Sequence, residues 1–140
     1  MSLTKIRKLK VQMLQVAEIR DLELSSLASA YVYFEKLVLK QIANKYNRRL
    51  LAGVCLLLAC KVNDPKELNY ARLLETVEKV LEVPPKEVYA HEFSVYAALE
   101  FTLFLPLWEI MPHLERIVDA STHTSVEEYL KNRTFFYSGH

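Results

Sequence analysis

The sequence predicts an all-α protein, and three observations support that class. Apolar residues recur at helical spacing along nearly the whole chain, whereas no strand-length alternation is bounded by hairpin turns. Only two glycines occur in 140 residues. The prolines fall mostly between the periodic segments, where they separate helices: Pro65, Pro84, Pro85, Pro106 and Pro112.

The periodic segments predict six helices and indicate a short seventh. The first three are expected at about Thr4 to Glu18, Glu23 to Lys40 and Asn47 to Val62. The fourth begins after Asn69 and is ended by Pro84 and Pro85, the fifth spans about Pro85 to Phe101, and the sixth begins at Pro106. Ser125 to Glu128 reads as a capping box, which would begin the seventh helix. We expect a five-helix core at residues 4–105, followed by a C-terminal helical extension and tail at 106–140.

The third helix is predicted to be central because it is apolar on every side. Gly53 lies in its middle, where glycine costs about 1 kcal/mol relative to alanine, so a neighbouring helix is expected to approach closely there. In the sixth helix an apolar series is expected to face the core: Trp108, Met111, Leu114, Ile117 and Val118. Tyr31, Tyr33 and Tyr96 are also expected to be core residues.

Composition excludes several classes of function. The net charge of +1 provides no bulk attraction to nucleic acid or to an anionic membrane. The longest apolar run, Leu50 to Cys60, is shorter than the ~18 residues of a membrane span, and no secretory signal is evident. Cys55 and Cys60 are poorly placed to pair on one helix, which favours a reduced, intracellular protein. The expected location is the nucleus, the cytoplasm or both.

The sequence does not predict an enzyme or a cofactor. Two glycines cannot build a phosphate-binding loop, and no GxSxG, HExxH or CxxC motif occurs. The four histidines are scattered without metal-ligand spacing. We therefore expect no catalytic residue, no metal and no cofactor.

Long segments resemble the cyclin box. "NRRLLAGVCLLLACKVND" is similar to the cyclin third helix, "HEFSVYAALEFTLFLP" to the fifth and "AYVYFEKLV" to the second. Within the cyclins the chain most resembles the Cables family, which links cyclin-dependent kinases to tyrosine kinases. The strings that carry this resemblance are "LTKIRKLK", "AYVYFEKLVLK", "NRRLLAG" and "FLPLWEIMPHLERIV".

The resemblance implies a binding site for a cyclin-dependent protein kinase in cell-cycle control. In cyclins a lysine ending the third helix and a glutamate in the fifth hydrogen-bond the kinase backbone, and Lys61 and Glu92 match those positions. Leu58, Val62 and Phe101 match apolar positions around the pair. Taken singly, Lys61 also suits any helix C-terminus, Glu92 an ordinary solvated helix, and Phe101 a core.

Other interpretations remain open. One alternative is a scaffold that holds a kinase without activating it. Another is DNA binding, as by the cyclin folds of basal transcription factors, although the 18 cations here balance 17 anions. A tyrosine kinase is expected to bind through regions outside these residues, and the unbound domain is expected to be a monomer. The basic run from Lys5 to Lys10 is interpreted as a solvated helix face, with a localisation signal or an acidic-partner patch as the alternatives. It also places charge where the substrate-docking groove of cell-cycle cyclins is apolar.

Overall fold

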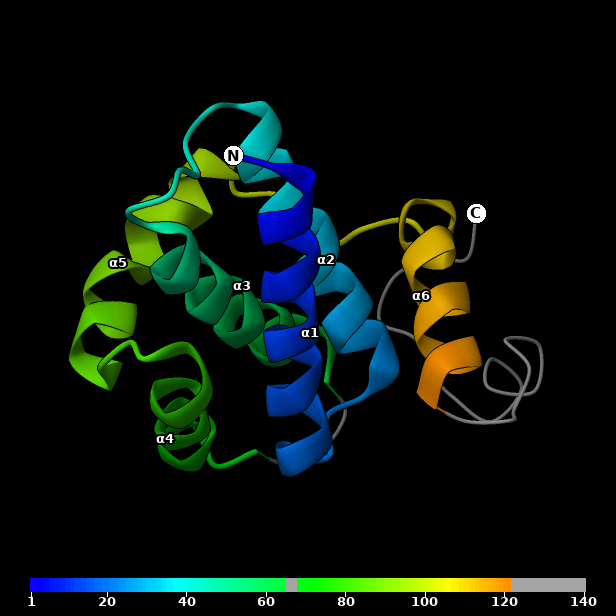
Figure 1. Ribbon diagram of the computed structural model, residues 1–140, viewed down its shortest axis with the longest axis horizontal. Helices are drawn as coiled ribbons and strands as arrows, with labels where there is room; N and C mark the ends of the chain where they lie inside the picture. Colours follow the sequence, from blue (N-terminus) through cyan, green and yellow to red (C-terminus); the bar gives the residue numbers. More distant parts are fainter. Residues whose placement is uncertain (65–67, 122–140) are drawn as a thin grey trace.

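A computed structural model describes residues 1–64 and 68–121 of the chain. Within these ranges the chain forms six α-helices and no strand, so the all-α class is confirmed (Figure 1). The helices are α1 (Leu3–Arg20), α2 (Leu24–Leu39), α3 (Arg48–Asn63), α4 (Tyr70–Leu81), α5 (Pro85–Ala98) and α6 (Leu107–Ser121). The predicted seventh helix at Ser125 lies outside the described residues.

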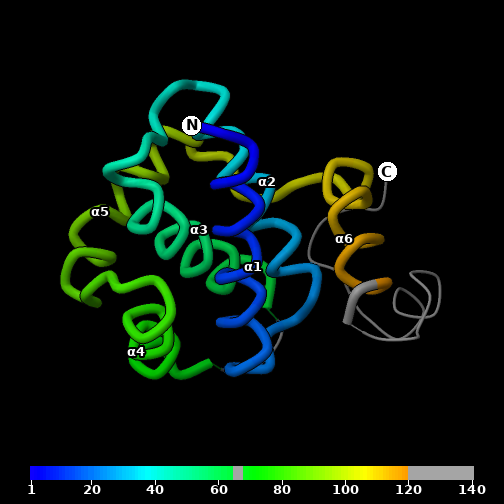
Figure 2. The backbone as a smooth tube through the Cα atoms, viewed as in Figure 1, coloured from blue at the N-terminus to red at the C-terminus, as the bar shows by residue number. Residues whose placement is uncertain are grey.

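Helix α3 is the centre of the fold. It packs against α1, α2, α4 and α5, and every residue from Leu51 to Cys60 is buried. In the tube view α4 and α5 lie on one side of α3, and α6 lies on the far side of α2 (Figure 2). The prediction of a central third helix is confirmed.

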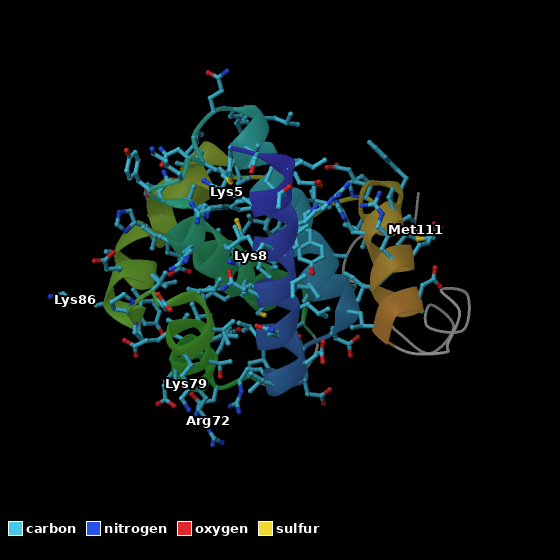
Figure 3. All side chains as sticks on the ribbon, in the orientation of Figure 1. Lys5, Lys8, Arg72, Lys79, Lys86 and Met111 are labelled. Atoms are coloured by element: carbon cyan, nitrogen blue, oxygen red, sulfur yellow. The ribbon has the colours of Figure 1, made fainter. Side chains whose placement is uncertain are left out.

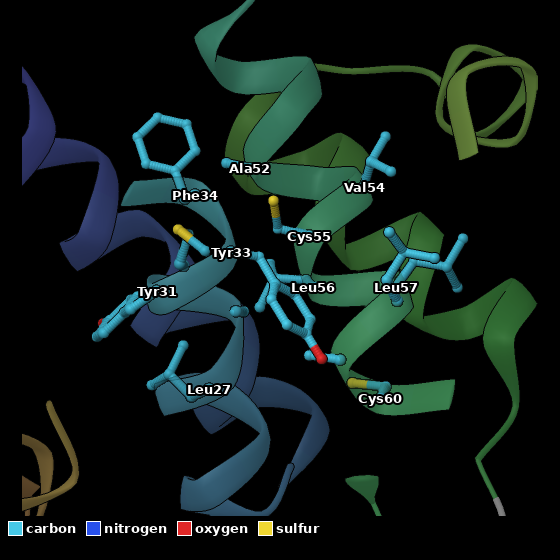
Figure 4. Close-up of a cluster of buried hydrophobic side chains, with 14 of the residues drawn as sticks. Leu27, Tyr31, Tyr33, Phe34, Ala52, Val54, Cys55, Leu56, Leu57 and Cys60 are labelled. Atoms are coloured by element: carbon cyan, nitrogen blue, oxygen red, sulfur yellow. The ribbon is translucent and has the colours of Figure 1, made fainter. Parts of the chain in front are cut away.

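The interior is built mainly where α2 meets α3. This core includes Tyr33 and Phe34 from α2 and Leu56 and Leu57 from α3, and all four are fully buried (Figure 4). Tyr31 is buried as well, so two of the three tyrosines expected in the core are confirmed, whereas Tyr96 is only half-buried. The Tyr33 hydroxyl donates a hydrogen bond to the Leu103 carbonyl, which satisfies its polar atom inside the core.

Both cysteines are buried free thiols on α3. Burial raises the pKa of the Cys55 and Cys60 thiols well above its usual range, because a thiolate is not solvated there. At neutral pH they therefore behave as small apolar groups.

Gly53 allows two helices to approach α3. A Cβ at this position would lie 3.0 Å from Cγ1 of Val77 on α4 and 3.6 Å from Cγ2 of Val88 on α5. The predicted close approach of a neighbouring helix is confirmed for α4, whereas the distance to α5 is that of ordinary contact.

The outer face of α6 differs from the prediction at one position. Trp108 was expected in the core, but 63% of it is exposed. The buried stripe of α6 is Ile110, His113, Leu114, Ile117 and Val118. Residues at this i, i+3, i+4, i+7 and i+8 spacing share one face, and Trp108, two residues before Ile110, falls on the opposite side. Met111 is half-buried.

Asn47, where the third helix was predicted to begin, occupies the N-cap position of α3, but its side chain makes no capping hydrogen bond. It stabilises the preceding loop instead. Its Oδ1 accepts a hydrogen bond of 2.8 Å from the Asn44 N–H, and its Nδ2 donates one of 2.9 Å to the Ile42 carbonyl. None of the helices described is long and apolar enough to cross a membrane.

Candidate protein-binding site

The structure brings Lys61 and Glu92 together. Lys61 lies in the last turn of α3 and Glu92 in the middle of α5, and Lys61 Nζ is 2.6 Å from Glu92 Oε2. The Lys61 ammonium also lies 5.7 Å from the centre of the Tyr70 ring at the start of α4. About 37% of the Lys61 side chain and 24% of the Glu92 side chain are exposed, so the pair remains accessible to a partner.

Contacts with α2 fix the end of α3 that carries Lys61. The Asp64 carboxylate, directly after α3, accepts a 3.0 Å hydrogen bond from the Glu23 N–H at the start of α2. The buried Asn63 amide donates to the hydroxyls of Ser25 and Ser26 at 2.9 and 3.1 Å. These hydrogen bonds between the end of α3 and the start of α2 hold the last turn of α3 in place.

An aromatic pocket of about 400 Å³ surrounds the ion pair. Its walls come from α3, α5 and the segment after α5: Leu58, Lys61, Tyr89, Glu92, Phe93, Tyr96 and Leu103. Tyr89 is 48% exposed and Phe93 is 71% exposed. Neither residue was predicted from the sequence, although Tyr89, Glu92, Phe93 and Tyr96 recur at the three- and four-residue spacing of one helical face.

Phe101 lies outside α5 and packs beside the aromatic pocket. The sequence predicted that α5 would extend to Phe101, but the helix is shorter. The helix stops at Ala98, not at Phe101, and Glu100 and Phe101 adopt left-handed φ angles of 59° and 57°. A helix cannot continue through two such residues. The Phe101 ring then packs edge-on against Tyr96 at 5.0 Å between ring centres, with Phe93 at 6.1 Å, and 55% of Phe101 is exposed.

Lys40, at the end of α2, stabilises this unusual helix end. Its ammonium donates a 3.0 Å hydrogen bond to the Ala98 carbonyl and lies 2.8 Å from a carboxylate oxygen of Glu100. The ammonium lowers the pKa of the Glu100 carboxyl through this hydrogen bond and its charge. A cation at a helix C-terminus also interacts favourably with the last carbonyl groups.

Four of the five predicted site residues form one surface. Leu58 lies beneath the ion pair and is 4% exposed, Lys61 and Glu92 form the pair, and Phe101 reaches it through Tyr96. Val62 is half-buried and does not line the pocket. Within residues 1–64 and 68–121 no cluster of three His, Cys, Asp or Glu side chains suits a metal ion. Exposed aromatic rings lie around a charged pair here, a combination that is common at protein interfaces.

The fold and this surface define a cyclin-like module, and comparison with known families identifies it. Residues 2–104 match the family model of the cyclin N-terminal domain, so the chain belongs to that family. Its resemblance to the Cables proteins is also confirmed. The chain is 46% identical over 123 residues to human CDK5 and ABL1 enzyme substrate 1, and 41% identical over 118 residues to mouse CDK5 and ABL1 enzyme substrate 2.

These two alignments cover 86% and 84% of this chain, but only 19% and 25% of the relatives. The chain therefore spans about a quarter or less of their length. A more distant match is the RNA polymerase II holoenzyme cyclin-like subunit of Candida glabrata, 31% identical over 98 residues, which are 68% of this chain and 28% of that protein. No solved structure matches the chain.

Proposed function

We propose that the α3–α5 surface binds a cyclin-dependent protein kinase, and that the domain acts as a non-catalytic kinase-binding module in cell-cycle control. The observation that carries this proposal is the Lys61–Glu92 pair at the edge of an exposed aromatic pocket. The names of the relatives, which describe substrates of CDK5 and ABL1 enzymes, are consistent with a kinase partner.

The ion pair suits a partner that presents its backbone. A lysine ammonium has three donors and a carboxylate has two acceptor oxygens, so each group can bind a partner while keeping its contact with the other. The pair is thus oriented before the partner arrives, which reduces the entropy lost on binding. A partner with no complementary polar groups would bury both charges without compensation, so the pair provides selectivity.

The aromatic side chains supply the apolar part of the surface. Phe93 and Phe101 are each more than half exposed, and both would lose water contact when covered. Aromatic residues that become fully desolvated at the centre of an interface are frequent hot spots. They are expected to contribute most of the binding energy, and the ion pair most of the selectivity.

The experiment is capture of purified cyclin-dependent kinases by the full chain, wild type beside Lys61→Ala/Glu92→Ala. A matched control is Arg49→Ala/Glu82→Ala, because this pair also joins two elements across the surface, with Arg49 Nη1 3.0 Å from Glu82 Oε2. We expect loss of capture with the first variant and normal capture with the control. Normal capture by the first variant would refute the proposed site.

Activation and scaffolding are two forms of this function. Activation requires that the domain position the regulatory helix of the kinase, whereas a scaffold needs only to hold the kinase. A kinase assay of the captured complex separates them, because only an activator raises the turnover of the kinase.

DNA binding by a cyclin fold is the alternative, and the charges of the chain do not favour it. Its 18 cations and 17 anions lack the excess of positive charge that nucleic-acid binding needs. Titration of the chain into duplex DNA at moderate salt tests this alternative. We further propose that the protein acts in the nucleus or cytoplasm, and that residues 4–105 form the kinase-binding box.

A further inference from the structure

The basic run at the start of α1 divides into two groups with different surroundings. Lys5 and Lys8 lie on the side of α1 that faces α3, where they line a small cavity with Arg48 and Arg49 (Figure 3). Arg7 and Lys10 line a different cavity, shared with Arg116 of α6. Residues three apart share a helical face, so a continuous charge run in sequence becomes two separate basic surfaces.

The second cavity is a groove of about 820 Å³ that we call the α1–α2–α6 groove. Its apolar lining comes from α1 and α2: Leu3, Ile6, Val11, Val38 and Leu39. Three of these side chains are largely exposed, namely Leu39 at 82%, Leu3 at 61% and Val11 at 55%. Clustered apolar side chains left in water at a concave site indicate a binding surface, whereas single exposed ones do not.

Most charged side chains at the rim of the groove are cations, and two of the three cations form no ion pair with a described residue. Glu35 is the one carboxylate among the lining residues, and Lys10 and His113 already bind it. Arg7 and Arg116 are exposed, and neither forms an ion pair with any residue in the described part of the chain. Two unpaired guanidinium groups beside an apolar floor favour a ligand that has apolar side chains flanked by carboxylates.

We propose that the α1–α2–α6 groove binds an acidic amphipathic segment of a second protein partner. Such a segment places apolar residues on the floor and carboxylates against Arg7 and Arg116. Residues 122–140 of this chain suit the groove less well, because Lys131 and Arg133 offset Glu127 and Glu128 there. A second copy of this chain, with its net charge of +1, has no acidic excess to offer either.

The groove and the aromatic pocket share no lining residue, and only Leu39 of the groove approaches the end of α5, where it lines a cavity with Glu100. Helices α5 and α6 stand on opposite sides of the bundle, with α3, α1 and α2 between them (Figure 1). A partner in the groove would therefore leave the kinase-binding surface open. This inference goes beyond the proposed kinase binding and does not depend on it.

The test uses the full chain and a fluorescein-labelled amphipathic peptide, with leucines at i, i+4 and i+7 and glutamates flanking that stripe. Binding is followed by fluorescence polarisation at low and moderate salt. The reversal variant is Arg7→Glu/Arg116→Glu, and its matched control is Lys5→Glu/Lys8→Glu, which makes the same charge change and shares α1 but lies outside the groove. Leu39→Asp tests the apolar floor, with Ile19→Asp, 55% exposed, as its control.

We expect the reversal to weaken peptide binding by about tenfold, because two exposed ion pairs are lost and replaced by repulsion. Leu39→Asp should weaken it similarly, and both controls should bind as the wild type does. Circular dichroism melts establish that all variants are folded. Added salt should weaken the wild-type complex.

Four outcomes would overturn the proposal. A scrambled peptide of equal composition that binds as well would show that charge alone is sensed, as would an equal loss with Lys5→Glu/Lys8→Glu. Tighter peptide binding by Phe135→Ala/Phe136→Ala would make the chain's own C-terminal segment the occupant. Self-association that Leu39→Asp abolishes, measured by sedimentation, would make a second copy the occupant.

Discussion

His113 on α6 is hydrogen-bonded through Nε2 to the carboxylate of Glu35 on α2. The other oxygen of Glu35 accepts a 3.0 Å hydrogen bond from Lys10 on α1, so one carboxylate connects three helices. His113 is only 8% exposed, and its ring also packs edge-on against Tyr31, with 5.6 Å between ring centres. This cluster fixes α6 to the core of the box.

Glu35→Gln should reduce the free energy of unfolding at pH 7 by about 1–2 kcal/mol, because it removes a carboxylate bound by two partners that stay in place. Burial alone would raise the pKa of Glu35, but the hydrogen bonds from His113 and Lys10 outweigh it and hold this pKa at about 2. About 41% of the Glu35 side chain is exposed, so solvent screening keeps the effect modest. Urea unfolding of both proteins measures the difference.

The lowered pKa also sets the sign of a pH dependence. An ionised Glu35 stabilises the fold fully above its ordinary value of 4.5, and this contribution is lost as the pH falls through about 2. Glu35→Gln should lack that part of the acid dependence. The matched control is Glu109→Gln, since Glu109 also joins α6 to α2 through an ion pair with Lys36 at 3.0 Å. An equal loss in both variants would contradict a special role for Glu35.

Gly53→Ala should lower the free energy of unfolding by about 1 kcal/mol. Alanine favours a helix interior by about 1 kcal/mol over glycine, but overpacking a core costs about 1–3 kcal/mol. The new Cβ would meet Val77 Cγ1 at 3.0 Å, and Val77 is fully buried, so the packing cost should exceed the gain. Thermal or urea unfolding measures the change.

A double-mutant cycle identifies the neighbour responsible. Val77→Ala removes the crowding methyl group, so the combined variant should lose less stability than the sum of the two single variants. If Gly53→Ala alone stabilises the protein, α4 can move aside at little cost, and glycine is not needed for the packing of α4 against α3.

Gln41→Gly should raise the free energy of unfolding by about 1 kcal/mol. Gln41 is exposed, follows α2 and has a left-handed φ of 60°, where a side chain is strained and glycine is not. Gln41→Ala keeps the strain and should bring no such gain. Equal stabilities of the glycine and alanine variants in urea unfolding would exclude strain at this position.

Phe93→Ala should leave stability nearly unchanged and weaken kinase capture strongly, by about 2 kcal/mol if Phe93 is a hot spot. The side chain is 71% exposed, so little packing is lost in the free domain. Trp108→Ala is the control, because Trp108 is a large aromatic residue with 63% exposure and lies on α6 outside the pocket. Quantitative capture assays and thermal melts distinguish the two effects. Equal capture by wild type and Phe93→Ala would remove this ring from the interface.

Much of the helical framework could be predicted because it rests on local periodicity. The starts of α2, α3 and α4 lie within a residue or two of the predicted positions, and α4 ends before Pro84, as predicted. The predicted end of α5 was wrong because Glu100 and Phe101 adopt left-handed φ angles. Glutamate and phenylalanine rarely adopt such angles, so the sequence gives no sign of them. Lys40 stabilises that end by binding the Ala98 carbonyl, 58 residues later in the chain. The sequence near Ala98 alone cannot predict such a long-range contact.

The candidate site was predicted only in part. Lys61 and Glu92 came from the resemblance to cyclins, and the structure brings them into contact, but their role in kinase binding stays a prediction. Tyr89 and Phe93 were missed because an exposed aromatic residue and a buried one look alike in a helical pattern. Trp108 was assigned to the core for the same reason, since only the angular position of the Ile110 stripe reveals that it faces outward.

Gly53 has a consequence for the surface as well as for the interior. Val88 of α5, one helical turn before Glu92, would lie 3.6 Å from a Cβ at position 53, so a side chain larger than alanine there would press on the helix that carries Glu92. A change at one dry, buried position would alter the separation of two surface charges while every surface residue stays the same. Two related domains with identical surface residues can therefore differ in the partner that they prefer. A comparison of exposed residues alone would overlook that difference.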